Sequence, residues 1–163
     1  MMALGIHCVD ELRFMLGQEV TEIAAITDRQ NDSQSLENLA TLCLRFSGGT
    51  IGTVTCGFRM PGFQNSVFLY GSDGKIIFNE AYPPHTLQGS MEISSQTVNN
   101  TTSYERNGLI LMQRQIESFN QAIQHGHQPA ATARDGLKAI QVIEAMIKSA
   151  ATGTTVKLEP LDF

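Results

Sequence analysis

The residues best suited to chemistry stand close to the start of the chain. His7 and Asp10 are three positions apart in the stretch GIHCVDELRFMLG, so on a helix they share one face. An imidazole with an ordinary pKa of about 6.5 can remove a proton near neutral pH, and a carboxylate beside it can orient the ring or raise its pKa. The pair is therefore a candidate general base with its support. A solvated surface pair is the alternative that the residues alone leave open.

Other motifs for chemistry are weak in this sequence. His125 and His127 flank a glycine, but a metal site needs at least one further ligand, which the neighbouring sequence does not offer. We expect these histidines to be solvated loop residues. The sequence contains no G-x-S-x-G elbow, no G-x-G-x-x-G and no P-loop, so neither a serine hydrolase nor a nucleotide site has a motif here.

Length, composition and charge narrow the class of protein. The chain has 163 residues, 42% hydrophobic and 17% charged, which fits one globular domain. Its net charge is -5, with 16 acidic and 11 basic residues and no basic cluster, so nucleic acid and anionic membranes are poor partners. No apolar run reaches the roughly 18 residues that a membrane span needs, and no signal sequence is evident. We expect a cytoplasmic protein.

The spacing of the cysteines favours free thiols over a disulfide framework. Cys8, Cys43 and Cys56 are odd in number and widely spaced, without C-x-x-C. This pattern favours neither disulfides nor a cysteine zinc site. Reduced, buried thiols are the expectation.

The first element that must position the candidate pair is an amphipathic helix over residues 5–16, which is expected to end at Gly17. At about 100° per residue, His7, Asp10, Glu11 and Phe14 share one face. The opposite, apolar face holds Cys8, Val9, Leu12, Met15 and Leu16.

A run of strands follows the helix. Alternating or β-branched segments predict strands at 19–27, 38–47, 50–60, 66–72, 74–80, 86–96 and 97–105. Ser47-Gly48-Gly49 and Ser72-Asp73-Gly74 are typical of tight hairpin turns, so the strands that they join must be antiparallel. The polar stretch at 29–37 between the first two strands is expected to be an exposed loop.

Two helices and a short strand close the chain. The first helix has an apolar stripe, and the second is expected to begin with a capping box of Thr132 and Asp135 and to end near Gly153. A strand at 154–160 follows. The pattern predicts an α+β fold, in which helices pack on one face of an open, mostly antiparallel sheet. The other face is a candidate surface for oligomerisation. The stripe of the first helix is Leu109, Met112, Ile116, Phe119 and Ile123.

The stretch GIHCVDELRFMLG resembles a signature of the glucose-fructose oxidoreductase and inositol dehydrogenase family, also called Gfo/Idh/MocA, in which G-x-H-x-x-D is followed by a glycine seven residues on. FLYGSDGKIIFN is similar to that family's G-x-x-G-x-I hairpin. Near the other end, Asp135-Gly136 at a helix start, S-x-x-x-G over 149–153 and a final V-x-L strand resemble its closing pattern. The resemblance covers essentially all of the chain.

The resemblance implies the second half of a two-domain enzyme. In this family an N-terminal Rossmann domain binds NAD or NADP, and a C-terminal domain supplies the substrate pocket and an open sheet for oligomerisation. Residues 1–163 resemble the C-terminal domain alone, so the glycine-rich phosphate loop and the family's E-K-P lysine are expected to lie outside this chain. No cofactor is expected to bind to it, and alone it should not turn over.

The resemblance also assigns roles to the candidate pair. His7 would remove a proton from a hydroxyl of a sugar or cyclitol while hydride leaves the same carbon for the nicotinamide, and Asp10 would support the helix or the histidine. One departure is Ala3, where the family often has an aspartate. The alternative function is a stand-alone, non-catalytic module that kept the family fold for binding or assembly.

Overall fold

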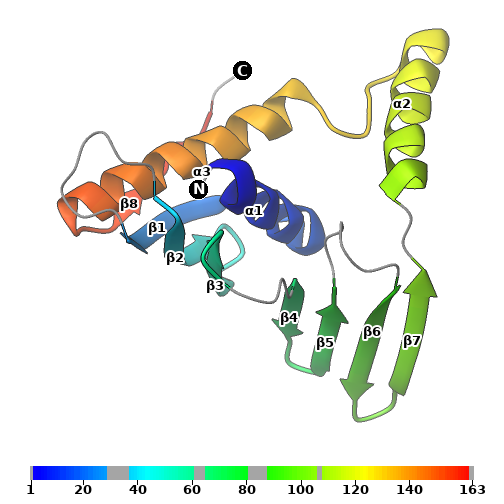
Figure 1. The fold of residues 1–163 in the computed structure, drawn as a ribbon, viewed down its shortest axis with the longest axis horizontal. Helices are drawn as coiled ribbons and strands as arrows, with labels where there is room; N and C mark the ends of the chain where they lie inside the picture. The colour runs from blue at the N-terminus through cyan, green and yellow to red at the C-terminus, as the bar shows by residue number, and fades with distance from the viewer. Residues whose placement is uncertain (1, 29–36, 61–64, 81–87, 106–107, 162–163) are drawn as a thin grey trace. The chain divides into compact units, whose positions relative to one another are not determined.

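The computed structural model describes residues 2–28, 37–60, 65–80, 88–105 and 108–161 (Figure 1). They belong to two compact units. The first unit combines Met1–Pro61 with Ala131–Phe163, and the second is Gly62–Ala130. The loop expected at 29–37 lies almost wholly outside the described residues.

The first unit contains a four-stranded sheet in the order β3-β2-β1-β8. Its strands are β1 (Val20–Thr27), β2 (Leu39–Phe46), β3 (Ile51–Gly57) and β8 (Val156–Lys157), and every neighbouring pair is antiparallel. The hairpin expected between β2 and β3 is confirmed. Gly49 supplies its positive φ of 87° and donates its N–H to the carbonyl of Phe46.

Two helices cover one face of this sheet, α1 (Met2–Leu16) and α3 (Ala133–Thr152) (Figure 1). Their apolar sides and the inner face of the sheet form one core, which holds the first unit together through burial of apolar surface. The residues of this core that are almost completely buried are Val9, Ile23, Leu42, Phe46, Val142 and Met146.

Helix α3 begins and ends where the sequence predicts. The hydroxyl of Thr132 accepts from the N–H of Asp135, and the Asp135 carboxylate accepts from the N–H of Thr132, which completes the capping box. At the other end Gly153 adopts a left-handed φ of 66°. Ser149, one turn earlier, is buried. Its Oγ accepts from the N–H of Ala25 and donates to the carbonyl of Thr154, so it fastens the end of α3 to β1.

The strand alternation is confirmed in β2, where every second residue from Ala40 to Phe46 is buried. Two expectations for neighbouring positions are wrong. Cys43 is exposed rather than buried, because its side chain belongs to the outer face of the sheet. The strand predicted at 50–60 ends earlier, at Gly57, so Phe58 lies outside β3 and its side chain is 57% exposed.

The second unit has its own four-stranded sheet in the order β4-β5-β6-β7. Its strands are β4 (Ser66–Tyr70), β5 (Gly74–Asn79), β6 (Gln88–Ser95) and β7 (Asn99–Glu105), again all antiparallel. At Gly74 a Cβ would lie 2.3 Å from the carbonyl oxygen of Ser94, so only glycine fits there.

The second unit also contains helix α2 (Gly108–His125), and the helix expected from its apolar stripe is therefore confirmed. The five side chains of that stripe are exposed.

The expected fold class, α+β, is confirmed by the three helices and two open antiparallel sheets of the described residues. The predicted strands divide between these two sheets. Among the described residues, no helix is long and apolar enough to cross a membrane.

Candidate functional site

Helix α1 presents the candidate pair on its exposed side. His7 and Asp10 are both exposed, and Phe14 on the same side is 87% exposed, whereas Val9 on the opposite side is completely buried. The faces predicted from the sequence are confirmed for these residues. Glu11 differs, because it is half-buried and burial raises the pKa of its carboxyl.

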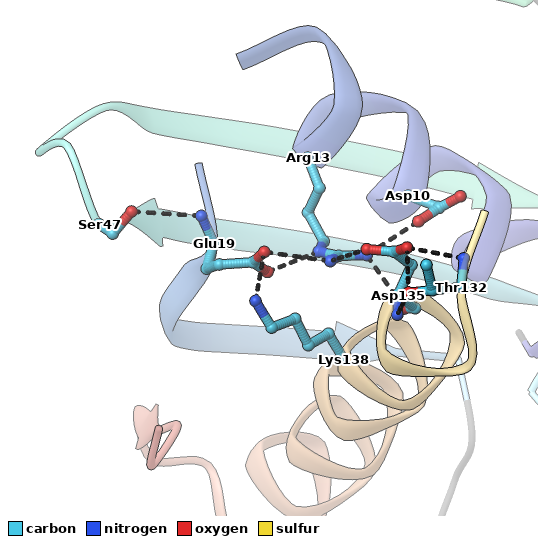
Figure 2. Close-up of polar contacts among 7 residues, drawn as sticks. All are labelled: Asp10, Arg13, Glu19, Ser47, Thr132, Asp135 and Lys138. Atoms are coloured by element: carbon cyan, nitrogen blue, oxygen red, sulfur yellow. Dashed lines mark hydrogen bonds and ion pairs between the residues drawn. The ribbon is translucent and has the colours of Figure 1, made fainter. Parts of the chain in front are cut away.

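The same helix carries a buried arginine that the sequence analysis did not single out. Arg13 is only 6% exposed, and its guanidinium faces three carboxylates (Figure 2). Its Nη1 lies 2.8 Å from Oδ1 of Asp10, and its Nε lies 2.8 Å from Oε2 of Glu19. Asp135 contributes a carboxylate oxygen 3.7 Å from Nη2 and a backbone carbonyl that accepts from Nη1 at 3.2 Å. Arg13 thereby ties α1 to the first turn of α3.

Glu19 extends this network to further elements. Its Oε1 accepts from Nζ of Lys138 on α3 at 2.6 Å, and its backbone N–H donates to Oγ of Ser47 in the β2–β3 turn (Figure 2). One carboxylate therefore joins the end of α1, helix α3 and the start of β1. We call Asp10, Arg13, Glu19, Asp135 and Lys138 the arginine network.

The electrostatics of the arginine network favour the charged forms. Burial alone would raise the pKa of Glu19, but hydrogen bonds from Arg13 and Lys138 and their positive charges outweigh it and lower that pKa. The pKa of Asp135 is lowered first by its hydrogen bonds with Thr132 and then by the two cations. Burial opposes the charge on Arg13, yet its carboxylate partners raise its pKa overall.

The arginine network bears on the role of Asp10. Of the two roles expected for it, support of the helix or of the histidine, the contact with Arg13 corresponds to support of the helix. This contact holds the middle of α1 in place one turn after His7. Catalytic roles for His7 and Asp10 remain predictions.

The signal that could have found Arg13 lies in the helical spacing. Arg13 is four residues after the buried Val9, so it shares the apolar face of α1. A cation on such a face needs anionic partners.

The second candidate pair has a different setting. The rings of His125 and His127 lie 6.2 Å apart between centroids and are stacked at 22°. Both residues are exposed, as expected, but only His127 is a loop residue, because His125 is the last residue of α2. Within the described part of the chain, no group of three His, Cys, Asp or Glu side chains could hold a metal ion.

Comparison with known proteins decides the family. The profile of a family described as "Oxidoreductase family, C-terminal alpha/beta domain", of the Gfo/Idh/MocA group, matches residues 1–158. The chain belongs to this oxidoreductase family, as its C-terminal domain. The resemblance noted in the sequence is thereby confirmed.

Characterised relatives of this Gfo/Idh/MocA domain are sugar and polyol dehydrogenases. The chain is 27% identical to a D-apiose dehydrogenase from Paraburkholderia graminis over 175 residues, which cover 98% of this chain and 44% of the relative. It is 24% identical to a myo-inositol 2-dehydrogenase from Thermotoga maritima, with 96% and 48% covered. The chain therefore spans about half the length of the relatives it matches.

A solved structure of an oxidoreductase shares the fold. Levoglucosan dehydrogenase in complex with NADH and L-sorbose superposes with a TM-score of 0.81 at 15% identity, over 97% of this chain and 49% of that one. At that identity the likeness concerns the fold alone.

Removal of Arg13 from the arginine network should lower the stability of the fold. Arg13→Met keeps the aliphatic packing but leaves three carboxylates without their shared cation, and we expect the free energy of unfolding to fall by about 1–3 kcal/mol in urea titrations. This is less than for a fully buried ion pair, because the carboxylates are partly hydrated.

Arg45→Met is the matched control, since Arg45 binds Glu22 at 3.1 Å on the outer face and is 54% exposed. It should change the free energy of unfolding by less than about 0.5 kcal/mol. Equal effects of the two variants would contradict a special role for Arg13.

The lowered pKa of Glu19 predicts a pH-dependent contribution to stability. A carboxyl with a lowered pKa in the folded state stabilises the fold above its unfolded pKa, about 4.3 for glutamate, and loses this contribution as the pH falls through the folded value. We therefore expect the stability lost in Glu19→Gln to be largest near pH 6 and to shrink as the pH falls below about 4. Urea midpoints measured across this range test it.

The control for this prediction is the same substitution in an Arg13→Met background. There the pH dependence of the Glu19→Gln effect should be smaller, because one of its two cations is gone. A Glu19→Gln effect that is constant from pH 6 to pH 3 would show that the ion pairs do not set the contribution of Glu19.

Proposed function

We propose that this chain is the substrate-binding and oligomerisation domain of an NAD(P)-dependent oxidoreductase that acts on a sugar, cyclitol or related hydroxyl compound. The observation that carries the proposal is the setting of His7, an exposed histidine on a helix whose next turn is anchored by Arg13 to Glu19 and Asp135. Membership of the family and relatives named as dehydrogenases of apiose and inositol support it.

The chemistry of His7 follows from its side chain. In alcohol oxidation the hydroxyl loses its proton while the carbon loses hydride, and a carbonyl forms. An imidazole nitrogen of His7 would take the proton, for which it must reach about 3 Å from the hydroxyl oxygen. NAD or NADP held by a Rossmann domain would accept the hydride.

The arginine network would contribute by positioning. General-base catalysis depends strongly on geometry, and a misplacement of about 1 Å can cost about 100-fold in rate. Arg13 and Asp10 hold α1 one turn beyond His7, so they would fix the direction in which the helix presents the imidazole. A buried arginine with several partners suits this task, because its planar fork binds more than one carboxylate at once.

The test of this function is a His7→Gln variant in the enzyme that joins this chain to its NAD(P)-binding domain. We expect kcat to fall by about 100- to 10,000-fold, because the general base is lost. Any pH dependence of the rate that arises from this base should vanish as well. NAD(P)H formation with a panel of sugars and polyols measures both.

His127→Gln is the control for the same assay, as it removes an exposed histidine elsewhere in the chain. Unchanged kcat and an unchanged pH profile in His7→Gln would rule out His7 as the base. This chain without a dinucleotide-binding domain should form no NAD(P)H.

The outer face of the first sheet supports the proposal of a homo-oligomer. Ile26 and Ile51 are 77% and 74% exposed there, beside Thr41, Thr53 and Thr55, on the face away from α1 and α3, which also holds the ion pair of Arg45 and Glu22. Such a surface is suited to contact with a second copy, since apolar side chains at its centre would lose water on association.

We expect light scattering at micromolar concentration to show a dimer or a dimer of dimers, and Ile26→Glu to shift it toward monomer by placing a charge at the contact. Phe14→Glu, which alters an exposed side chain of α1 instead, is the control and should leave the assembly unchanged. A wild-type monomer, or equal effects of both variants, would contradict assembly through this sheet.

A further inference from the structure

Two cysteines far apart in the sequence meet inside the first unit. Helix α1 packs against β3. Cys56 on β3 is 8% exposed and belongs to the buried core, and Cys8 on α1 packs against the same core from a half-buried position. The side chains of Cys8 and Cys56 are joined by a hydrogen bond. All three cysteines of the chain are reduced thiols.

The hydrogen bond makes the two thiols unequal. The hydrogen bond with Cys56 lowers the pKa of Cys8, against the opposing effects of burial and of Glu11. The pKa of Cys56 is raised, first by this hydrogen bond and then by burial. Thiolate is the nucleophilic form of cysteine. Cys8, which is also the more exposed of the two, is therefore suited to react first.

We propose that Cys8 and Cys56 form a redox pair that a hydroperoxide oxidises reversibly to a disulfide between α1 and β3. The proposal rests on the packing of α1 against β3, the packing of Cys8 against the core cluster that contains Cys56 and the partial exposure of Cys8. It does not depend on the proposed enzymatic function.

The steps balance with hydrogen peroxide as the oxidant. The Cys8 thiolate attacks one peroxide oxygen, the O–O bond breaks, and the released hydroxide takes a proton to form water, which leaves Cys8 as a sulfenic acid. The Cys56 sulfur then attacks the Cys8 sulfur, and the sulfenic oxygen leaves as a second water with the Cys56 proton. Two thiols and one peroxide give one disulfide and two waters. A small-molecule dithiol reverses the reaction by thiol–disulfide exchange.

The third cysteine provides an internal control. Cys43 is on β2, where Leu42 and Leu44 on either side of it are buried and its own side chain is exposed. It therefore lies on the outer face of the sheet, away from the core that Cys56 joins. If exposure alone decided the site of oxidation, Cys43 would react first. If the partner thiol of Cys56 decides it, Cys8 reacts first.

The proposed disulfide would lie next to the candidate base, His7. Cys8 follows His7 directly in the sequence. A disulfide would tie the first half of α1 covalently to β3, in addition to the tie that Arg13 makes in the second half. Oxidation would therefore act one residue away from the exposed imidazole.

The experiment treats the 163-residue chain with one equivalent of hydrogen peroxide, blocks the remaining thiols with an alkylating reagent and maps the peptides by mass spectrometry. We expect a cross-linked peptide pair containing Cys8 and Cys56, lighter by two hydrogen atoms, with Cys43 alkylated. Dithiothreitol should restore both thiols. Loss of the Cys43 thiol before that of Cys8, or Cys8 over-oxidised beside an intact Cys56 thiol, would overturn the proposal.

Variants separate the two steps. Cys43→Ser should give the same cross-link, and Cys8→Ser should leave the Cys56 thiol unreacted. In Cys56→Ala the sulfenic acid should persist on Cys8 and be trapped by dimedone. Circular dichroism checks that each variant is folded. If Cys56→Ala does not fold, the peptide map of the oxidised wild-type chain tests the proposal instead. A Cys56→Ala chain that is folded but yields no dimedone adduct would contradict Cys8 as the attacking thiol.

Discussion

The first unit depends on one buried charge. Burial of a guanidinium is costly unless hydrogen bonds and opposite charges compensate it. Arg13 finds that compensation only where Asp10, Glu19 and Asp135 converge. Its charge therefore fixes the position of α1 relative to α3 and β1 more specifically than apolar packing does, because apolar contacts tolerate small shifts and a three-partner arginine does not. The helix that carries His7 takes its position from this constraint.

The motifs that relate the chain to the Gfo/Idh/MocA family have direct physical explanations in this structure. The aspartate of the D-G motif completes the cap of α3 and also pairs with Arg13, so the start of α3 and the position of α1 share one residue. Ser149 and Gly153 of S-x-x-x-G end α3 and attach it to β1 through the Ala25 N–H. Gly74 of G-x-x-G-x-I lets two strands approach closely. These motifs build the scaffold, whereas the histidine of the first motif is exposed.

Local patterns predicted most of the elements, because glycine turns, caps and side-chain alternation depend on neighbouring residues. The hairpin at Gly49 and the cap at Thr132 are examples. Contacts between distant positions were not predictable in this way. Arg13 meets Asp135 across 122 residues, and Cys8 meets Cys56 across the unit. The division of the strands between two sheets was not predictable either, because the sequence indicates strand pairing only where a short turn joins two strands. Cys43 was misplaced because composition says how often cysteine is buried, not which face of a strand it takes.

We propose that this domain works as half of a two-domain dehydrogenase in which α1 presents His7 to the substrate. The most direct measurement is the nucleotide sequence upstream of the Met1 codon in the source genome. We expect an in-frame Rossmann domain with a strand, G-x-G-x-x-G or G-x-G-x-x-A and a later E-K-P. A stop codon or an unrelated coding sequence there would contradict it, and would favour a binding or assembly module that has the family's fold without its cofactor.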